Sequence, residues 1–114
     1  YFSYGLHTLA NGQPRFWIAR TGGASNRAGT AGMFKAQTWH HIAGVYNGAQ
    51  LRLYIDGTFV GSTNATGNLA GYDTVLRLGA NGAITETLAG KLDDVRIYNR
   101  ALSEAEVRYL VGDR

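Results

Sequence analysis

The sequence predicts an all-β sandwich of about seven strands followed by one short helix. Three observations favour this fold. The stretch from Gln37 to Ser62 contains three apolar runs, separated by Asn47-Gly48 and Asp56-Gly57. Both dipeptides are typical of tight hairpin turns, because they adopt positive φ at low cost. The chain also has 16 glycines and a single proline, as expected for many short strands, and one clear helix start at Ser103.

The central stretch organises the rest of the chain. Its two turn signals divide it into antiparallel strands at Trp39–Tyr46, Gln50–Ile55 and Thr58–Ser62. One face of such a three-stranded meander is apolar, so it requires a second layer to cover it.

The remaining strands are assigned from alternating or apolar runs between polar segments. Strands are expected at Tyr1–His7, Arg15–Arg20, Val75–Gly79 and Leu88–Asn99, with a short edge strand at Ala31–Lys35. Turns are expected at Ala10-Asn11-Gly12 and Asn81-Gly82, and long polar loops at Thr21–Thr30 and Thr63–Asp73.

The predicted helix begins after Ser103. Ser103 and Glu106 match a capping box, in which each side chain accepts a hydrogen bond from the backbone N–H of the other. Leu102 and Val107 have the spacing of a hydrophobic staple, and Gly112 suits the end of the helix. The helix is therefore expected to make about two turns.

Composition excludes several classes of protein. The length of 114 residues predicts one domain, 1–114, and a 45% hydrophobic content argues against disorder. The net charge is +3 and no two basic residues are adjacent, which argues against nucleic-acid binding. No stretch is long and apolar enough for membrane insertion, and without cysteine there is no disulfide or cysteine zinc site.

Two segments together resemble laminin-G-like domains of the concanavalin A-like jelly-roll superfamily. The first is TWHHIAGVYNGAQLRLYIDGTFVGS, from Thr38, and the second is LAGKLDDVRIYNRALSEAEVRYL, ending at Leu110. YGLHTLANGQPRFWI matches the hairpin that precedes them in that family. The resemblance implies an antiparallel jelly-roll sandwich in an extracellular or cell-surface protein, with His40-His41 as part of the strand signature.

The resemblance also implies that strands are missing. Members of the family carry several strands before the point that corresponds to Tyr1, and one of them usually lies beside the closing Asp93–Tyr98 strand. The chain is therefore expected to be a fragment of a larger domain or protein, or a module completed by another chain. Its uncovered sheet edges predict self-association or pairing with a complementing chain.

Asp93 and Asp94 form the main carboxylate cluster. They are candidate ligands for a structural calcium ion, which prefers carboxylate and carbonyl oxygens. The alternative is that one carboxylate bonds backbone groups where a strand begins while the other faces water. Adjacent strand residues point to opposite faces, which makes a shared ion harder to build.

The candidate ligand-binding residues are arginines and tyrosines that alternate with apolar strand residues. They are Arg52, Tyr54, Arg77, Arg96 and Tyr98, with Arg15 and Trp17 as further members of an outward sheet face. Arginine binds carboxylate or sulfate groups, and aromatic rings stack on sugars or peptide chains. The alternative is a solvated sheet face on which arginine and tyrosine are simply good strand residues.

These observations predict a non-catalytic, extracellular, lectin-like recognition module that binds carbohydrate or protein. The alternative is a structural assembly module that forms an oligomer or filament through sheet edges. A glycosidase is not expected, because two facing carboxylates are needed and no apolar strand carries an alternating acidic pair.

Overall fold

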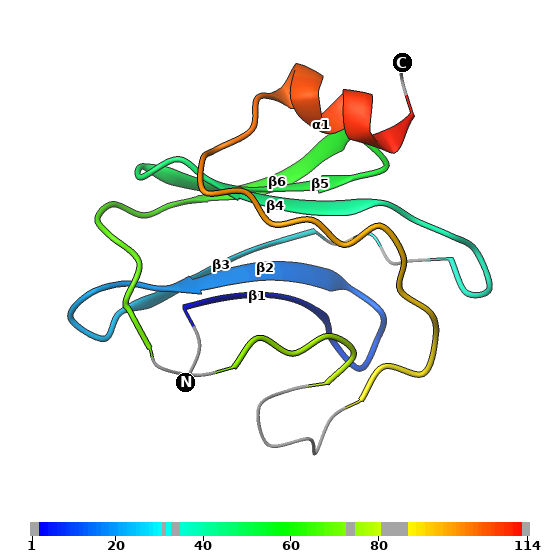
Figure 1. The fold of residues 1–114 in the computed structure, drawn as a ribbon, viewed down its shortest axis with the longest axis horizontal. Coiled ribbons are helices and arrows are strands. Elements are labelled where there is room, and N and C mark those ends of the chain that lie inside the picture. Colours follow the sequence, from blue (N-terminus) through cyan, green and yellow to red (C-terminus); the bar gives the residue numbers. More distant parts are fainter. Residues whose placement is uncertain (1–2, 31, 33–34, 73–74, 81–86, 113–114) are drawn as a thin grey trace.

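The computed structural model describes residues 3–30, 32, 35–72, 75–80 and 87–112. Two three-stranded antiparallel sheets stack face to face, and one helix lies on the outer side of the second sheet (Figure 1). The first sheet has the order β1 (Tyr4–Thr8), β2 (Pro14–Ala19) and β3 (Ser25–Gly29), and the second the order β4 (Ile42–Tyr46), β5 (Gln50–Ile55) and β6 (Thr58–Asn64). The helix α1 spans Glu104–Val111. The predicted all-β sandwich with a short C-terminal helix is confirmed.

The predicted meander is confirmed as β4, β5 and β6. At its second turn, Asp56 and Gly57 both have positive φ, 52° and 81°, as a primed turn requires. The Asp56 N–H donates to the His41 carbonyl at 2.8 Å, and the Asp56 side chain accepts from the His41 N–H at 2.9 Å. The aspartate therefore ties this turn to the start of β4.

The first turn differs from the prediction by one position. Tyr46 pairs with Leu51, and the Asn47 N–H donates to the Gln50 carbonyl at 3.3 Å, so Gly48 and Ala49 form the centre of the turn. Gly48 supplies the positive φ of 88°. Asn47 contributes through its side chain, which accepts hydrogen bonds from the N–H groups of Ala49 and Gln50.

The first sheet contains a strand where a loop is predicted. Residues Ser25–Gly29, inside the expected Thr21–Thr30 loop, form β3 and pair with β2. The sequence SNRAG shows no alternating apolar pattern that would predict a strand, because Ala28 is its only buried side chain. Small and polar residues form a strand here because β2 provides the hydrogen-bonding partner and the facing sheet leaves room for nothing larger.

The core lies between the two sheets. Its buried members are Phe16, Ile18, Ala28, Leu51, Leu53 and Ala65, and Ile42, Tyr46 and Val60 pack against them. The central strands β2 and β5 therefore bury alternate residues, as expected for a sandwich.

Glycines set the distance between the sheets. A Cβ atom on Gly61 of β6 would lie 2.0 Å from the backbone oxygen of Gly29 on β3, so the two edge strands approach backbone to backbone. Thr63 strengthens this side of the sandwich, because its hydroxyl donates to the Arg27 carbonyl at 2.5 Å. A Cβ on Gly44 would meet the Phe16 ring at 2.4 Å, so that ring lies directly on β4.

The predicted capping box of α1 is confirmed. The Ser103 hydroxyl accepts from the Glu106 N–H at 3.2 Å, and Glu106 accepts from the Ser103 N–H at 2.9 Å. Arg100 also pairs with Glu106, at 2.5 Å between Nη2 and Oε2. The hydrogen bonds that Glu106 accepts from Arg100 and from the Ser103 N–H lower the pKa of Glu106 to about 2. Gly112 ends the helix with a φ of 117°, as predicted.

The helix packs on the outer face of the second sheet. Val107 is fully buried there against Val45 and Tyr54, with Leu102 and Ala43 beside them. Arg108 and Val111 also lie close to Gly57 at the second turn. The helix therefore covers the outward side of β4 and β5 (Figure 1).

Two predicted strands are absent from the described chain. The residues of Val75–Gly79 and Leu88–Asn99 belong to no strand, and an isolated bridge joins Ala80 to Thr87. Their apolar side chains are exposed, with Leu76 at 61% and Ile97 at 55%. Both segments have strand-forming sequences, but neither pairs with a strand of the described chain.

The last residue of the expected Thr63–Asp73 loop lies outside the described residues, and three further expectations fall wholly or partly outside them. These are the start of the Tyr1–His7 strand, the Ala31–Lys35 edge strand and the Asn81-Gly82 turn.

We expect Gly61→Ala to destabilise the fold by about 1–3 kcal/mol, because the new methyl group would overlap the backbone of β3 and force the sheets apart. Gly71→Ala is the matched control, since a Cβ at Gly71 meets nothing within 4 Å. Urea unfolding of both variants measures the difference. Equal midpoints would show that the close approach of β3 and β6 is not required.

Candidate functional site

The predicted ligand-binding residues do not share one exposed face. Arg52 and Tyr54 lie together on the outer side of β5, but Tyr54 is only 2% exposed because α1 covers it. Tyr54 was expected to point to solvent, and that expectation is wrong. The alternation along β5 indicated correctly that Tyr54 points away from the inter-sheet core, but not that a helix from the far end of the chain packs on it.

Arg52 lies at the margin of this covered region. Its guanidinium carbon lies 4.4 Å from the centre of the Phe59 ring and 5.8 Å from that of Tyr54. Both contacts are favourable cation–π interactions. The buried Nε of Arg52 has no hydrogen-bond partner within the described part of the chain. Arg52 therefore has a packing role on the aromatic rings, whatever its outer end binds.

Arg77, Arg96 and Tyr98 lie in the two segments that form no strand. All three side chains are exposed. Among residues 75–80 and 87–112, no hydrogen bond, ion pair or ring contact joins them to Arg52. Their role as ligand-binding residues stays a prediction.

A different surface gathers arginine and aromatic side chains: the outer side of the first sheet. Register places His7, Arg15 and Gly29 in one row across β1, β2 and β3, and Gly5, Trp17 and Arg27 in the next. We call this surface the arginine face. Phe16, Ile18 and Ala28 point the opposite way into the core, so the arginine face is the outer side of the sheet.

Glycines shape the arginine face. A Cβ on Gly5 would meet the Trp17 indole at 2.6 Å, and a Cβ on Gly29 would meet the Arg15 stem at 3.3 Å. The two large side chains of β2 therefore lie across glycines of the neighbouring strands. This arrangement leaves a shallow hollow of about 470 Å³, lined by Gln13, Arg15, Arg27, Gly29 and Thr30.

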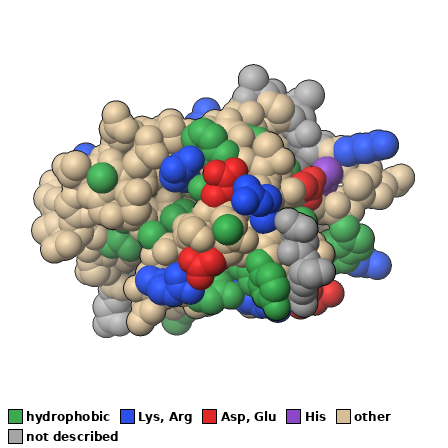
Figure 2. Space-filling view, turned by 90° about the horizontal axis from the view of Figure 1, so that it is seen from above, with side chains coloured by type: hydrophobic (Ala, Val, Ile, Leu, Met, Phe, Trp, Pro, Cys, Tyr) green, Lys and Arg blue, Asp and Glu red, His purple; other side chains and the backbone are tan. Residues whose placement is uncertain are grey.

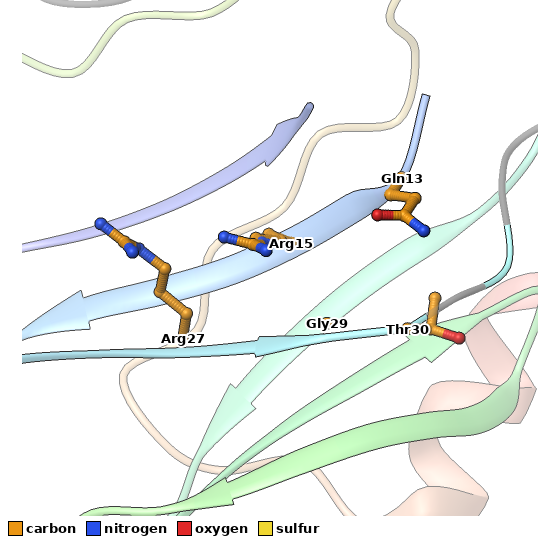
Figure 3. A pocket seen from close by; sticks show the side chains of 5 residues that line it. All are labelled: Gln13, Arg15, Arg27, Gly29 and Thr30. Carbon is orange, nitrogen blue, oxygen red and sulfur yellow. The ribbon is translucent and has the colours of Figure 1, made fainter. Parts of the chain in front are cut away.

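The lining groups of the hollow are mainly hydrogen-bond donors. Figure 3 shows Arg15 on β2 and Arg27 on β3 projecting from the same side of the sheet, with Gln13 and Thr30 at the other end of the hollow. Neither guanidinium has an ion-pair or hydrogen-bond partner among the described residues. Arg20, in contrast, donates to Asn26 at 2.8 Å and to the Thr66 carbonyl at 2.7 Å.

Arg27 and Thr30 were missed from the sequence because the segment was assigned to a loop. The signal that could have found Arg27 is its spacing from Ala28, since the one apolar residue of that segment marks the inward side. Arg15 and Trp17 were identified as members of an outward face, but were grouped with residues of the other sheet.

His40 and His41 have a structural role in the described chain. The His40 Nδ1 lies 2.9 Å from the Asp56 carboxylate. Partial burial alone would raise the pKa of Asp56, but the hydrogen bonds from His40 and from the His41 backbone outweigh it and lower that pKa. The histidine pair therefore fixes the turn between β5 and β6. This agrees with its place in a strand signature.

Asp93 and Asp94 are both exposed, and their arrangement matches a local backbone role. The Asp93 carboxylate accepts from the Asp94 N–H at 2.8 Å, and Asp94 has a positive φ of 52°. The described residues contain no group of three or more His, Cys, Asp or Glu side chains that could hold a metal ion. The calcium site stays a prediction.

The comparisons with known proteins agree with this fold. The family model described as the concanavalin A-like lectin/glucanases superfamily, of the laminin G type, matches residues 2–108. This chain is a laminin-G-like domain. The match covers both sheets and most of α1, so the membership rests on nearly the whole chain.

The laminin-G-like domain is also similar to one solved structure, that of an S-layer domain-containing protein (residues 221–444) from Clostridium thermocellum. The two share 26% sequence identity with a TM-score of 0.54. The similarity covers 96% of this chain and 56% of that one, so the domain spans about half the length of its structural neighbour. No curated protein matches the chain. Among the described residues, no helix is long and apolar enough to cross a membrane.

We expect calcium to raise the melting temperature of the laminin-G-like domain, because an ion that binds only the folded state stabilises it. A double variant, Asp93→Asn with Asp94→Asn, should lose this effect. The amide oxygen introduced at position 93 can still accept the backbone N–H of residue 94, so the comparison isolates carboxylate charge from the local hydrogen bond. Identical melts of the native domain in excess calcium and in chelator would contradict the calcium site.

Proposed function

We propose that this laminin-G-like domain is a non-catalytic, extracellular, lectin-like recognition module that binds its carbohydrate or protein ligand on the arginine face. The observation that carries the proposal is the juxtaposition of Arg15, Arg27 and Trp17 on one solvent side of the first sheet. Arginine forks bind planar acceptor groups, and an indole provides a flat apolar surface for a sugar ring or a peptide chain.

The contrast between the two outer faces supports this choice of surface. The outer side of the second sheet is covered by α1, and Figure 2 shows acidic, basic and hydrophobic side chains interspersed on that side of the molecule. The arginine face has no such cover from α1 and carries a hollow lined by polar side chains. It is therefore the outer sheet face that α1 leaves uncovered, and we place the ligand there.

The residues of the first sheet also support a non-catalytic role. Its three strands contain no aspartate or glutamate. Glycoside hydrolysis needs two carboxylates on either side of the scissile bond, roughly 5–9 Å apart. A ligand on this sheet therefore meets binding groups without a carboxylate pair from the strands beneath it.

The proposed location is the cell surface or the extracellular space. Family membership supports this location, and so does the likeness to an S-layer domain-containing protein. The absence of cysteine neither favours nor opposes it.

A glycan array tests the proposal when it is read with single-residue variants. We expect Arg27→Ala to weaken binding, whereas Lys91→Ala, at an exposed basic residue off both sheets, should leave it unchanged. Both changes should alter stability by no more than about 0.5 kcal/mol, because the two side chains are exposed. Binding that responds to Arg77 or Arg96 and not to Arg27 would transfer the site to those segments.

A second candidate function is assembly through a sheet edge, and a separate observation favours it. The sheets pack through β2 and β3 against β5 and β6, leaving β1 and β4 as the edges of what we call the open side. Leu6 faces inward by register with Phe16, yet it is 46% exposed. Edges with uncovered apolar side chains accept a further strand.

We expect the isolated chain to associate at low micromolar concentration, because its open side and the side chains of Leu92, Val95 and Ile97 are exposed to water. Light scattering measures the mass, and Leu6→Lys with Ile97→Lys should reduce it. A folded monomer with a cooperative melt would contradict assembly and leave the recognition proposal intact.

A further inference from the structure

We propose that residues 92–98 pair with the same residues of a second copy of this domain, as two antiparallel strands centred on Val95. We call these residues, Leu-Asp-Asp-Val-Arg-Ile-Tyr, the closing segment. This inference rests on the second candidate function, assembly, and gives that assembly a partner and a register. It is independent of recognition on the arginine face.

The closing segment is uncovered in the described chain. All residues from 87 to 101 are exposed, and among them Leu92 is 54%, Val95 48% and Ile97 55% exposed. In Figure 1 this part of the chain, drawn in orange, crosses between β4 and β2 before it rises to α1. Contiguous exposed apolar side chains in a soluble domain mark a contact with another molecule.

The charges of the closing segment are complementary to those of a second copy in the reverse direction. Asp94 and Arg96 lie one residue before and one residue after Val95. In an antiparallel pair centred on Val95, Asp94 of each copy therefore lies opposite Arg96 of the other. Opposite charges at such positions stabilise a strand pair, and like charges destabilise it. A pair centred on either neighbour of Val95 would place like charges opposite each other, so charge favours Val95 as the centre.

The same register sorts the apolar side chains by face. Alternation in a strand places Val95 and Ile97 on one face, with Asp93 beside them. Two copies therefore gather four aliphatic side chains on that face, and Asp93 lies at its two corners. On the opposite face, Leu92 of each copy lies opposite Tyr98 of the other. One face of the paired strands is therefore largely apolar, and the other carries the two ion pairs between Leu–Tyr contacts.

The backbone of the closing segment is available for strand pairing. Its residues belong to no helix or strand, and Asp94 has a positive φ of 52°, a region that is disfavoured for residues with a side chain. Extension into a strand removes this unfavourable φ. It also releases the Asp94 N–H from the Asp93 carboxylate, so that this donor can bond to the second copy.

The symmetry of the pair predicts a closed dimer. A two-fold axis through Val95 makes the contact isologous, because the same residues face each other in both copies. Such a contact is satisfied by two chains and does not propagate into a filament.

Charge reversal tests the register. In a pair of Asp94→Arg copies arginine faces arginine twice, and in a pair of Arg96→Asp copies aspartate faces aspartate twice. Each variant alone should therefore dimerise at least about tenfold more weakly than the native domain. An equal mixture of the two should form a heterodimer, because each arginine of one copy then faces an aspartate of the other. Sedimentation velocity measures the masses and the dissociation constants.

Asp93→Arg is the matched control for these variants. It makes the same change in net charge as Asp94→Arg at the adjacent exposed aspartate. Position 93 lies opposite Ile97 of the second copy and outside the ion pairs, so the dissociation constant should change by less than about threefold. Thermal melts confirm that each variant folds.

A single cysteine locates the two-fold axis. The chain has no cysteine, so Val95→Cys supplies its only thiol. Opposed residues of an antiparallel pair have Cα atoms about 4.5–5.5 Å apart, which lies within the range of about 4.4–6.8 Å that a disulfide requires. We expect oxidation with glutathione disulfide to link two copies of Val95→Cys. Leu88→Cys, at an exposed residue outside the closing segment, should link more slowly.

The results separate this inference from the assembly on which it rests. Association that survives both charge reversals would overturn the pairing of closing segments. If Leu6→Lys then abolished that association, assembly through the edge of β1 would stand. Masses that grow beyond two copies in the native domain would overturn the closed dimer. A folded monomer at every concentration would overturn both the pairing and the assembly.

Discussion

The close approach of the two sheets is the constraint on which the rest of the structure depends. At Gly61 and Gly29 the strands β6 and β3 lie backbone to backbone, and at Gly44 the ring of Phe16 lies directly on β4. The core can then be thin, and Ile18, Leu51 and Leu53 fill it without exposure to water. A side chain on one of these glycines would separate the layers and uncover those residues.

The two outer faces of the sandwich differ in their side chains and in whether α1 covers them. The outer side of the second sheet has apolar residues, Val45 and Tyr54, and α1 buries them with Val107. The outer side of the first sheet has arginine and tryptophan instead, and α1 lies on the opposite side of the sandwich (Figure 1). One sheet therefore uses its outer side for stability, and the outer side of the other sheet carries the surface that we propose for a ligand.

Two segments with strand-like sequences form no strands in the described chain, although the sandwich has an open side at β1 and β4. Leu92, Val95 and Ile97 alternate as strand residues do, yet they are exposed and pair with no neighbour within the described chain. A strand needs hydrogen bonds from an adjacent strand, so sequence propensity alone cannot form one. The same reason underlies the proposed assembly through a sheet edge, which is independent of recognition on the arginine face.

The sequence by itself determined the features that depend on neighbouring residues. These include the Asp56-Gly57 turn, the Ser103 capping box, the Gly112 helix end and the alternation of β5, because positive φ, capping and pleat alternation are local. The family followed from motifs as well. The tertiary structure alone decided that Tyr54 is covered by α1, that Ser25–Gly29 forms a strand, and that Arg15 and Arg27 share a face. Each of these depends on which distant element packs or pairs with a residue, and such contacts leave no signal in the local sequence.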